Sequence, residues 1–329
     1  MDTSENGRPH SRPFWSFLVK PSTLAYIREA RNTPGFSLFD WIHGYVYIRW
    51  PYLYIGVGTG EHRLTRLLMP VWRLVTRFWK PRALDAQVSQ CIGFADTYHG
   101  KVVPLEQASR LVSIDRDIDI TNLEQIIPYR LARDIILHNP DHIAALQCPC
   151  RTARENPCQP LDVCLIVGEP FASFIVEHHP ERARWIDREE CLTILREEHQ
   201  RGHVHHAFFK DAMLGRFYAI CNCCSCCCGA IQAWRNGTPM LASSGYVSRI
   251  DPELCIQCET CMDYCQFGAI TEVDDMIAVD EEICMGCGVC VSQCPCDAAS
   301  LERAPHKGEP LEIQSLLAAD SVAAAMPAN

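Results

Sequence analysis

The sequence of 329 residues lacks any run of about 18 uncharged apolar residues. His43 and Arg49 interrupt the best candidate, at 41–60, so no transmembrane helix is expected. The first residues are polar and contain no apolar core of a secretory signal peptide. The 21 cysteines are therefore expected to be reduced thiols rather than exported disulfides, in a reducing, anaerobic cytoplasm.

Acidic residues are scarce in the first 82 residues, which contain 12 Lys and Arg against 5 Asp and Glu. The remaining residues carry 18 basic and 35 acidic side chains, so the two parts should meet different partners. Within the basic part, residues 62–80 predict an amphipathic helix. Its apolar face contains Leu64, Leu67, Leu68, Val71, Trp72, Val75, Phe78 and Trp79, and its basic face contains Arg66, Arg73, Arg77 and Lys80. Such a helix packs on its own domain or on a subunit, or lies on an anionic surface at the inner face of the cell membrane.

Two cysteine runs near the carboxyl end share one spacing. Cys255-x2-Cys258-x2-Cys261-x3-Cys265 recurs 29 residues later as Cys284-x2-Cys287-x2-Cys290-x3-Cys294. This spacing is typical of two [4Fe-4S] clusters, with the fourth cysteine of each run binding the other cluster. One expected ligand set is Cys255, Cys258, Cys261 and Cys294; the other is Cys284, Cys287, Cys290 and Cys265. Zinc is the weaker alternative, because zinc sites favour two separated C-x2-C pairs.

Residues 250–302 resemble the bacterial two-[4Fe-4S] ferredoxins, also through Asp251 and Asp280 at matching offsets and Ala269 and Ala298 after each run. The segment 270–279 reads as the short hairpin that this fold requires. Gln266 follows the first run where the family usually has Pro, which places the local turn and a hydrogen bond to the Cys265 sulfur in question.

Ten further cysteines form two groups in the middle of the chain. The first group is Cys148, Cys150, Cys158 and Cys164; the second is Cys221, Cys223, Cys224, Cys226, Cys227 and Cys228. We expect them to bind one or two more clusters, with the Arg151 guanidinium as a donor to cluster sulfide. In a local partition, the first group binds one cluster and Cys221, Cys223, Cys224 and Cys227 bind another. In a shared partition, each group gives two thiolates to each cluster.

From about residue 102 onward the chain is similar to larger cysteine-rich dicluster ferredoxin-type proteins of anaerobic bacteria, through its CPCR motif at 148–151 and CNCC motif at 221–224. Cys227-Cys228-Gly229 also resembles the CCG motif of heterodisulfide-reductase catalytic subunits, which bind noncubane clusters. The downstream cysteine pair of that family is missing, so disulfide-cleaving chemistry is not carried over.

The pattern as a whole predicts an α+β protein with mainly helical N-terminal and middle regions. We expect a basic, aromatic-rich region at 1–100, a cysteine-rich domain at 101–244, a two-cluster ferredoxin domain at 245–305 and a flexible tail at 306–329. Helices are expected through most of 101–147, including 129–138 and one starting at Asp141. His203, His205 and His206 are expected in a surface loop rather than at a metal.

These features favour an electron-transfer subunit of an oxidoreductase complex, which relays single electrons through its clusters. The expected partners are a redox donor and acceptor, such as a flavoprotein or a membrane oxidoreductase, and an anionic membrane surface at 62–80. The alternative is an oxidoreductase with substrate chemistry at an unusual middle-domain cluster. Nucleic acid is not an expected partner, because the basic residues alternate with an apolar face instead of lining a polar groove.

Overall fold

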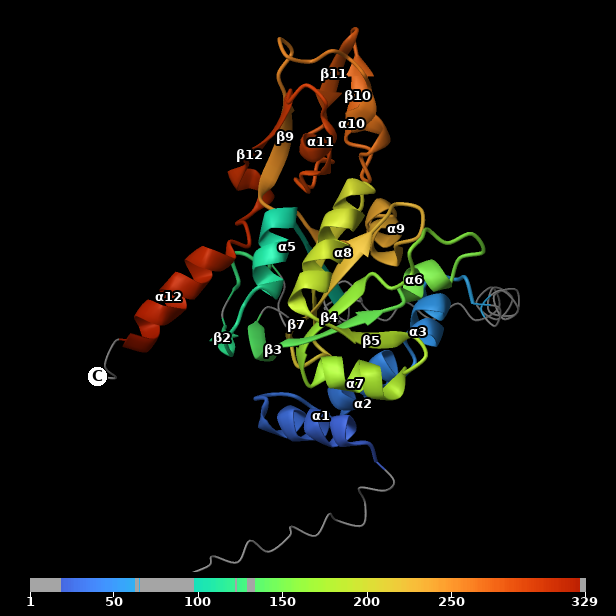
Figure 1. Cartoon of the computed structure of the whole chain (residues 1–329), viewed down its shortest axis with the longest axis vertical. Helices are drawn as coiled ribbons and strands as arrows, with labels where there is room; N and C mark the ends of the chain where they lie inside the picture. Colours follow the sequence, from blue (N-terminus) through green and yellow to red (C-terminus); the bar gives the residue numbers. More distant parts are fainter. Residues whose placement is uncertain (1–18, 63–64, 66–97, 122, 129–133, 326–329) are drawn as a thin grey trace, which may run out of the picture.

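The computed structural model describes residues 19–62, 65, 98–121, 123–128 and 134–325. It comprises N-terminal helices, a central domain built on one mixed sheet, and a C-terminal module at the end opposite α1 (Figure 1). Apart from His62 and Thr65, the expected amphipathic helix at 62–80 lies outside the described residues, as does Cys91.

The central sheet has the strand order β2-β3-β4-β7-β6-β1-β8, and β5 pairs with β3 off this path. Its pairs are antiparallel except for the parallel pair of β1 and β8. The strands are β1 (Tyr98–Val103), β2 (Ile118–Ile120), β3 (Ile135–Leu146), β4 (Cys164–Glu169), β5 (Ala183–Ile186), β6 (Val204–Lys210), β7 (Arg216–Cys223) and β8 (Leu241–Ala242).

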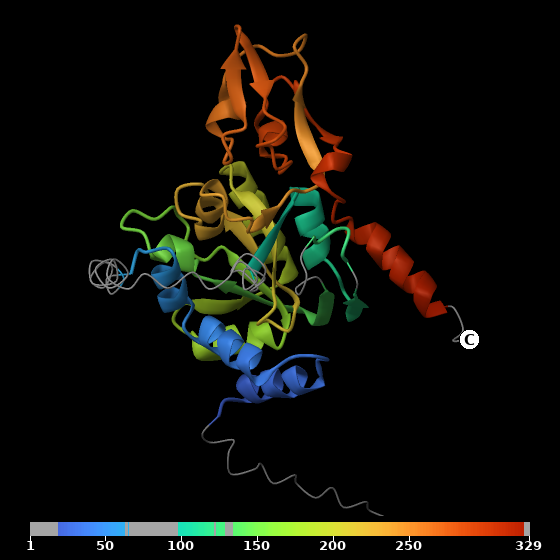
Figure 2. The same ribbon diagram turned by 180° about the vertical axis from the view of Figure 1, so that it is seen from behind.

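Helices cover both faces of this sheet. On one face, α5 (Leu105–Val112) and α8 (Arg188–Gln200) pack against residues such as Ile143 and Ala145. On the other face, Ala144 and Leu146 join α1 (Pro21–Asn32), α2 (Leu38–Arg49) and α7 (Phe171–His178), which Figure 2 shows from behind. Both faces of the sheet are covered, so every residue of a strand such as β6 is buried. Buried and exposed residues do not alternate along it. The short helices α3 (Pro51–Gly58), α6 (Pro149–Thr152) and α9 (Gly229–Arg235) lie at one end of the sheet.

The helical expectation for 101–147 is wrong, although both helices and sheets are present as the α+β class predicted. Apart from α5, the named elements of this stretch are strands, and the residues expected to form helices around 135–138 and from Asp141 belong to β3. In a short stretch of sequence, the positions of Ile135, Leu137 and Ile143 fit the periodicity of a helix as well as that of a strand. Their pairing with β2, β4 and β5 decides for the strand, and two of these partners lie far along the chain.

The C-terminal module forms two small antiparallel pairs, β9 (Tyr246–Ile250) with β12 (Ala299–Arg303) and β10 (Ile270–Val273) with β11 (Met276–Val279). The second pair confirms the predicted hairpin. Its turn residues Asp274 and Asp275 have φ of 52° and 59°, as a tight hairpin turn requires. Between the pairs lie two short helices, α10 (Thr260–Asp263) and α11 (Val289–Gln293).

The segment expected to be a flexible tail contains η4 (Pro305–Lys307) and α12 (Ile313–Ala325). Leu311 and Ile313 are buried in the core beneath α5, so this part of the chain is attached to the sheet domain. The expectation rested on local composition, which does not show the apolar surface that these two residues cover. Among the described residues, no helix has the length and apolar content needed to cross a membrane.

Candidate metal centre

The C-terminal module brings together the cysteines that the crossed pattern requires. Cys265 lines one cavity with Cys284, Cys287 and Cys290, although it belongs to the other run. In the same way, Cys294 lies near enough to Cys258 and Cys261 to affect the ionisation of both thiols. The module therefore presents two sets of four thiols, each assembled from both halves of the repeat.

Both ligand sets receive backbone hydrogen bonds at sulfur, as expected of thiolates that bind clusters. The N–H of Ala269 donates to Cys265 Sγ at 3.2 Å, and the N–H of Ala298 donates to Cys294 Sγ at the same distance. In addition, Ser248 N–H donates to Cys284 Sγ at 3.4 Å. Backbone donors of this kind stabilise thiolates and tune cluster potentials.

Burial distinguishes the two sets. Desolvation raises the pKa of Cys290 to about 11, so this thiol ionises only when metal binding supplies the driving force. Cys258 is exposed instead, and its pKa is lowered by hydrogen bonds from the side chain and backbone of Thr260. The set with Cys258 is therefore the outer one, and the set with Cys290 is the inner one.

Gln266 connects the inner set to the sheet domain. Its Oε1 accepts a hydrogen bond from the N–H of Ser225 at 2.7 Å, and its carbonyl accepts one from Arg235 at 2.8 Å. Ser225 lies between Cys224 and Cys226, and Gln266 follows Cys265. The Gln266 side chain therefore joins the inner set to the second cysteine group. The departure from Pro leaves the bond to Cys265 Sγ in place and supplies this bridge.

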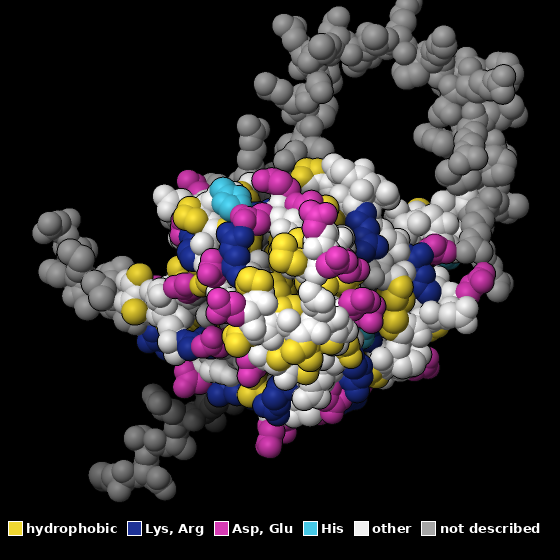
Figure 3. Space-filling view, turned by 90° about the horizontal axis from the view of Figure 1, so that it is seen from above, with side chains coloured by type: hydrophobic (Ala, Val, Ile, Leu, Met, Phe, Trp, Pro, Cys, Tyr) yellow, Lys and Arg dark blue, Asp and Glu magenta, His cyan; other side chains and the backbone are white. Residues whose placement is uncertain are grey.

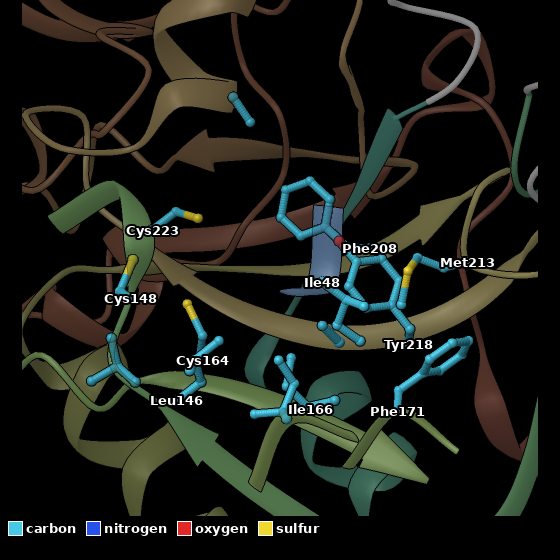
Figure 4. Packing of buried hydrophobic residues seen from close by; sticks show 14 of the residues in the cluster. Ile48, Leu146, Cys148, Cys164, Ile166, Phe171, Phe208, Met213, Tyr218 and Cys223 are labelled. Carbon is cyan, nitrogen blue, oxygen red and sulfur yellow. The ribbon is translucent and has the colours of Figure 1, made fainter. Parts of the chain in front are cut away.

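Six of the ten middle-domain thiols form a closed ring, here called the six-thiol group. Each thiol lies close enough to two others to affect their ionisation, in the order Cys148, Cys150, Cys228, Cys223, Cys221, Cys164 and back to Cys148. They come from the start of α6, the start of β4, the end of β7 and the residue before α9. Figure 4 shows Cys148, Cys164 and Cys223 gathered at one end of the core, away from Phe208 and Tyr218.

The other four thiols belong to Cys158, Cys224, Cys226 and Cys227, here called the four-thiol group. Cys158 is thus separated from the rest of its sequence group. This arrangement is neither the local partition nor the shared one, because three cysteines of each group enter the ring. Cys226 and Cys228 were not among the expected ligands, and nothing in the spacing of the dense run distinguishes them. Only the pairing of β4 with β7 shows which thiols meet.

Arg151 is buried next to Cys150, and protein groups hold its guanidinium in place. One of its terminal nitrogens donates to Glu198 at 2.5 Å and to the Asn222 carbonyl at 3.1 Å, and lies 3.0 Å from His203 Nδ1. Burial disfavours the charged guanidinium, but the Glu198 carboxylate holds the pKa of Arg151 above its ordinary value. Its Nε is buried and has no hydrogen-bond partner among the described residues. A contact between Arg151 and cluster sulfide stays a proposal.

Neighbouring thiols and the positive charge of Arg151 together lower the pKa of Cys221. The neighbouring thiols of Cys164 and Cys223 lower the pKa of Cys221 to about 6 against the effect of burial, and the Arg151 charge lowers it further. The ring therefore contains a thiol that ionises readily, as a metal ligand must.

The three histidines expected in a surface loop are buried, and two of them lie in β6. His206 is opposite Cys221 in the β6–β7 pair, so both side chains lie on one face of the sheet. Burial lowers the pKa of His206 to about 3, and neither ring nitrogen has a hydrogen-bond partner among the described residues. A buried neutral imidazole with a free donor on the same sheet face as Cys221 fits a cluster whose sulfides accept hydrogen bonds.

An apolar cavity of about 770 Å³ adjoins the six-thiol group. Its walls are α2, α3, the start of α6 and the end of β7, and all six ring cysteines line it. Trp50, Leu53 and Val57 lie at its outer side and are between 44% and 46% exposed. The volume is in the range of small-molecule sites.

The C-terminal module is strongly acidic. Residues 245–305 contain twelve Asp and Glu against two Arg. Figure 3 views this end of the molecule and shows acidic side chains across it, with apolar side chains between them. Leu254 and Ile256, which flank Cys255, are 52% and 65% exposed.

Comparison with known proteins supports 4Fe-4S binding by the C-terminal module. The family model described as a 4Fe-4S binding domain matches twice, at residues 248–271 and 277–300. No curated protein matches the chain significantly.

Proposed function

We propose that this chain is a multi-cluster electron-transfer protein that relays single electrons from the C-terminal module to the six-thiol group. The two 4Fe-4S binding domains imply iron–sulfur electron transfer. Clusters held by the thiolates supply reversible one-electron chemistry. The observation that carries the proposal is the contact between the inner ligand set and the cysteine-rich part of the sheet domain.

That contact has two parts. Gln266, next to Cys265, accepts a hydrogen bond from the N–H of Ser225 at its Oε1. Phe267 packs its ring 5.3 Å from that of Trp234 and 6.5 Å from that of His206, which lies opposite Cys221. Cys290 of the inner set also lies near Cys261 of the outer set. The order from solvent inward is outer set, inner set, six-thiol group.

The outer end suits a soluble redox donor with a basic docking surface, such as a flavoprotein. Exposed Leu254 and Ile256 offer an apolar contact beside Cys255, and the surrounding Asp and Glu select a positively charged partner. Electrostatic attraction of this kind raises the association rate and weakens with salt.

The opposite end suits an anionic membrane surface or a membrane-bound acceptor. Leu38 and Phe39 on α2 are 73% and 75% exposed, and Leu53 and Val57 continue the apolar surface on α3. The basic sequence that follows, at 62–80, adds charges attracted to anionic lipid. Peripheral attachment at this end would bring the cavity beside the six-thiol group near the membrane.

The test is the iron and sulfide content of full-length protein isolated without oxygen. Three [4Fe-4S] clusters predict about 12 iron and about 12 sulfide per chain, and a larger cluster on six thiolates raises both. A content of about 8, with the ferredoxin clusters intact, contradicts a cluster at the six-thiol group.

Cys265→Ser tests the crossed ligand sets. It should perturb the paramagnetic signal of the cluster bound by Cys284, Cys287 and Cys290 while leaving the other cluster unchanged. An effect confined to the cluster of Cys255 means that the fourth cysteine does not cross over.

The cavity favours one second function, substrate chemistry at the six-thiol group. Its largely apolar walls would hold a small hydrophobic molecule within reach of the ring cysteines. Val57→Arg places a charge at the outer side of the cavity. A loss of electron transfer to a small hydrophobic acceptor, with metal and sulfide content unchanged, supports this function; unchanged transfer to every acceptor argues against it.

A further inference from the structure

The four-thiol group differs from the other cysteine sets in its compactness. The sulfurs of Cys158, Cys224, Cys226 and Cys227 all lie within 4.8 Å of one another. Cys226 Sγ is 3.1 Å from Cys158 Sγ and 3.6 Å from Cys227 Sγ. Throughout the described part of the chain, no other set of three or more His, Cys, Asp or Glu side chains offers ligand atoms this close together.

This compactness distinguishes a single metal ion from a cluster. Metal–sulfur bonds of about 2.3 Å in a tetrahedron place the sulfurs about 3.8 Å apart. In a [4Fe-4S] cluster each thiolate binds a different iron, so the sulfurs are separated by the width of the cluster. The two ligand sets of the C-terminal module, whose residues are all described, are more widely spread than the four-thiol group, as clusters require.

Hydrogen bonds hold this arrangement in place. The backbone N–H groups of Cys158 and Cys227 lie near the sulfurs of Cys227 and Cys224, respectively. Arg154 donates to the Cys227 carbonyl at 3.3 Å and to Gln232 Oε1 at 2.5 Å, while Gln232 donates to the Cys226 carbonyl at 3.1 Å. Donors to thiolate sulfur and to ligand backbone are the outer contacts of a metal site.

We propose that Cys158, Cys224, Cys226 and Cys227 bind one tetrahedral divalent metal ion, zinc or iron, and not an iron–sulfur cluster. Four thiolates in a closed tetrahedron are the ligand set of a structural site. The ion joins the segment after α6 to the cysteine-rich loop, which the metal-free chain connects only through hydrogen bonds and packing.

The position of this ion gives it a structural role in the relay. Cys223 and Cys224 are adjacent, as are Cys227 and Cys228, and in each pair one thiol belongs to the six-thiol group and the other to the four-thiol group. Fixing Cys224 and Cys227 therefore fixes the backbone that presents Cys223 and Cys228 to the ring. The metal would add rigidity to this backbone without carrying electrons itself, and the hydrogen bonds of Arg154 and Gln232 keep the neighbouring ligand set in place when the ion is lost.

The test measures zinc, iron and acid-labile sulfide in the full-length protein isolated without oxygen. We expect about one zinc per chain, or about one iron in excess of sulfide, since [4Fe-4S] clusters contain iron and sulfide in equal numbers. Cys226→Ser, at an exposed position, should remove that one ion and leave the sulfide content unchanged. Cys191→Ala, at a buried cysteine of α8 outside both groups, is the matched control and should change neither.

Three results overturn the proposal. One is wild-type protein with neither zinc nor excess iron, a measurement that does not depend on how the variants fold. Another is a joint loss of about four iron and four sulfide from both Cys226→Ser and Cys158→Ser, which would identify a cluster. The third is a disulfide between Cys158 and Cys226 in the anaerobic protein. Sulfide content tests the relay, whereas zinc or sulfide-free iron tests this site, so the two proposals fail separately.

Discussion

A single side chain, Gln266, defines the contact between the ferredoxin-like module and the cysteine-rich loop. A proline at this position has no side-chain acceptor, so the N–H of Ser225 would lose its partner at 2.7 Å. The bond from Ala269 to Cys265 Sγ does not depend on this side chain.

Gln266→Pro should therefore lower the unfolding free energy by about 1 kcal/mol, because the partly buried amide of Ser225 loses its hydrogen-bond partner. The two ferredoxin clusters should keep their paramagnetic signals. Gln266→Glu retains an acceptor oxygen and should lose less stability than the proline variant. Denaturant unfolding under anaerobic conditions measures both, and equal losses in the two variants would mean that the hydrogen bond is not the cause.

At the scale of elements, the close packing of α9 against the end of α3 shapes the six-thiol group. A Cβ on Gly229, the first residue of α9, would lie 2.8 Å from Thr59 Cγ2 and 3.8 Å from Cys150 Sγ. The first distance is shorter than van der Waals contact, so with a side chain at position 229 either the Thr59 side chain or the two helices must shift.

Gly229→Ala should destabilise the protein by about 1–3 kcal/mol through overpacking. Thr59→Ser removes Cγ2 but keeps the hydroxyl that donates to the Ile55 carbonyl at 2.9 Å. The double variant should recover most of the lost stability in the same unfolding measurement. Additive losses in the double variant would show that the methyl contact is not responsible.

On the scale of the whole molecule, the two ends differ in charge and apolar exposure. The C-terminal module is acidic, while α2 and α3 expose apolar side chains and precede the basic sequence at 62–80. This difference between the two ends would orient the protein, with the acidic end toward a soluble donor and the apolar end toward a membrane surface.

Binding to vesicles tests this orientation. Wild-type protein should float with vesicles rich in anionic lipid and dissociate as salt rises, because the attraction of the basic residues is screened. Leu38→Glu with Phe39→Glu, or Leu68→Glu with Trp72→Glu, should abolish flotation. Val273→Glu with Met276→Glu, at exposed positions of the acidic module, is the control and should still float. If the wild type stays in solution with every vesicle, the apolar surface faces a protein.

The sequence alone determined the features that depend on local spacing. Cysteine intervals indicated two clusters with crossed ligands, and the alternation around Asp274 and Asp275 predicted the hairpin. The 4Fe-4S binding domains and the hairpin are confirmed, because a ligand run or a tight turn is specified within a few residues. The crossed ligand sets stay a prediction.

Only the tertiary structure decided how the ten middle cysteines divide. Cys164 meets Cys221 because β4 pairs with β7, and Cys158 meets Cys226 across an interval that local periodicity does not cover. The same applies to β3, whose partners lie far along the chain, and to Leu311 and Ile313, whose burial depends on a core formed elsewhere. Long-range pairing set these contacts, and no short window of sequence contains both partners.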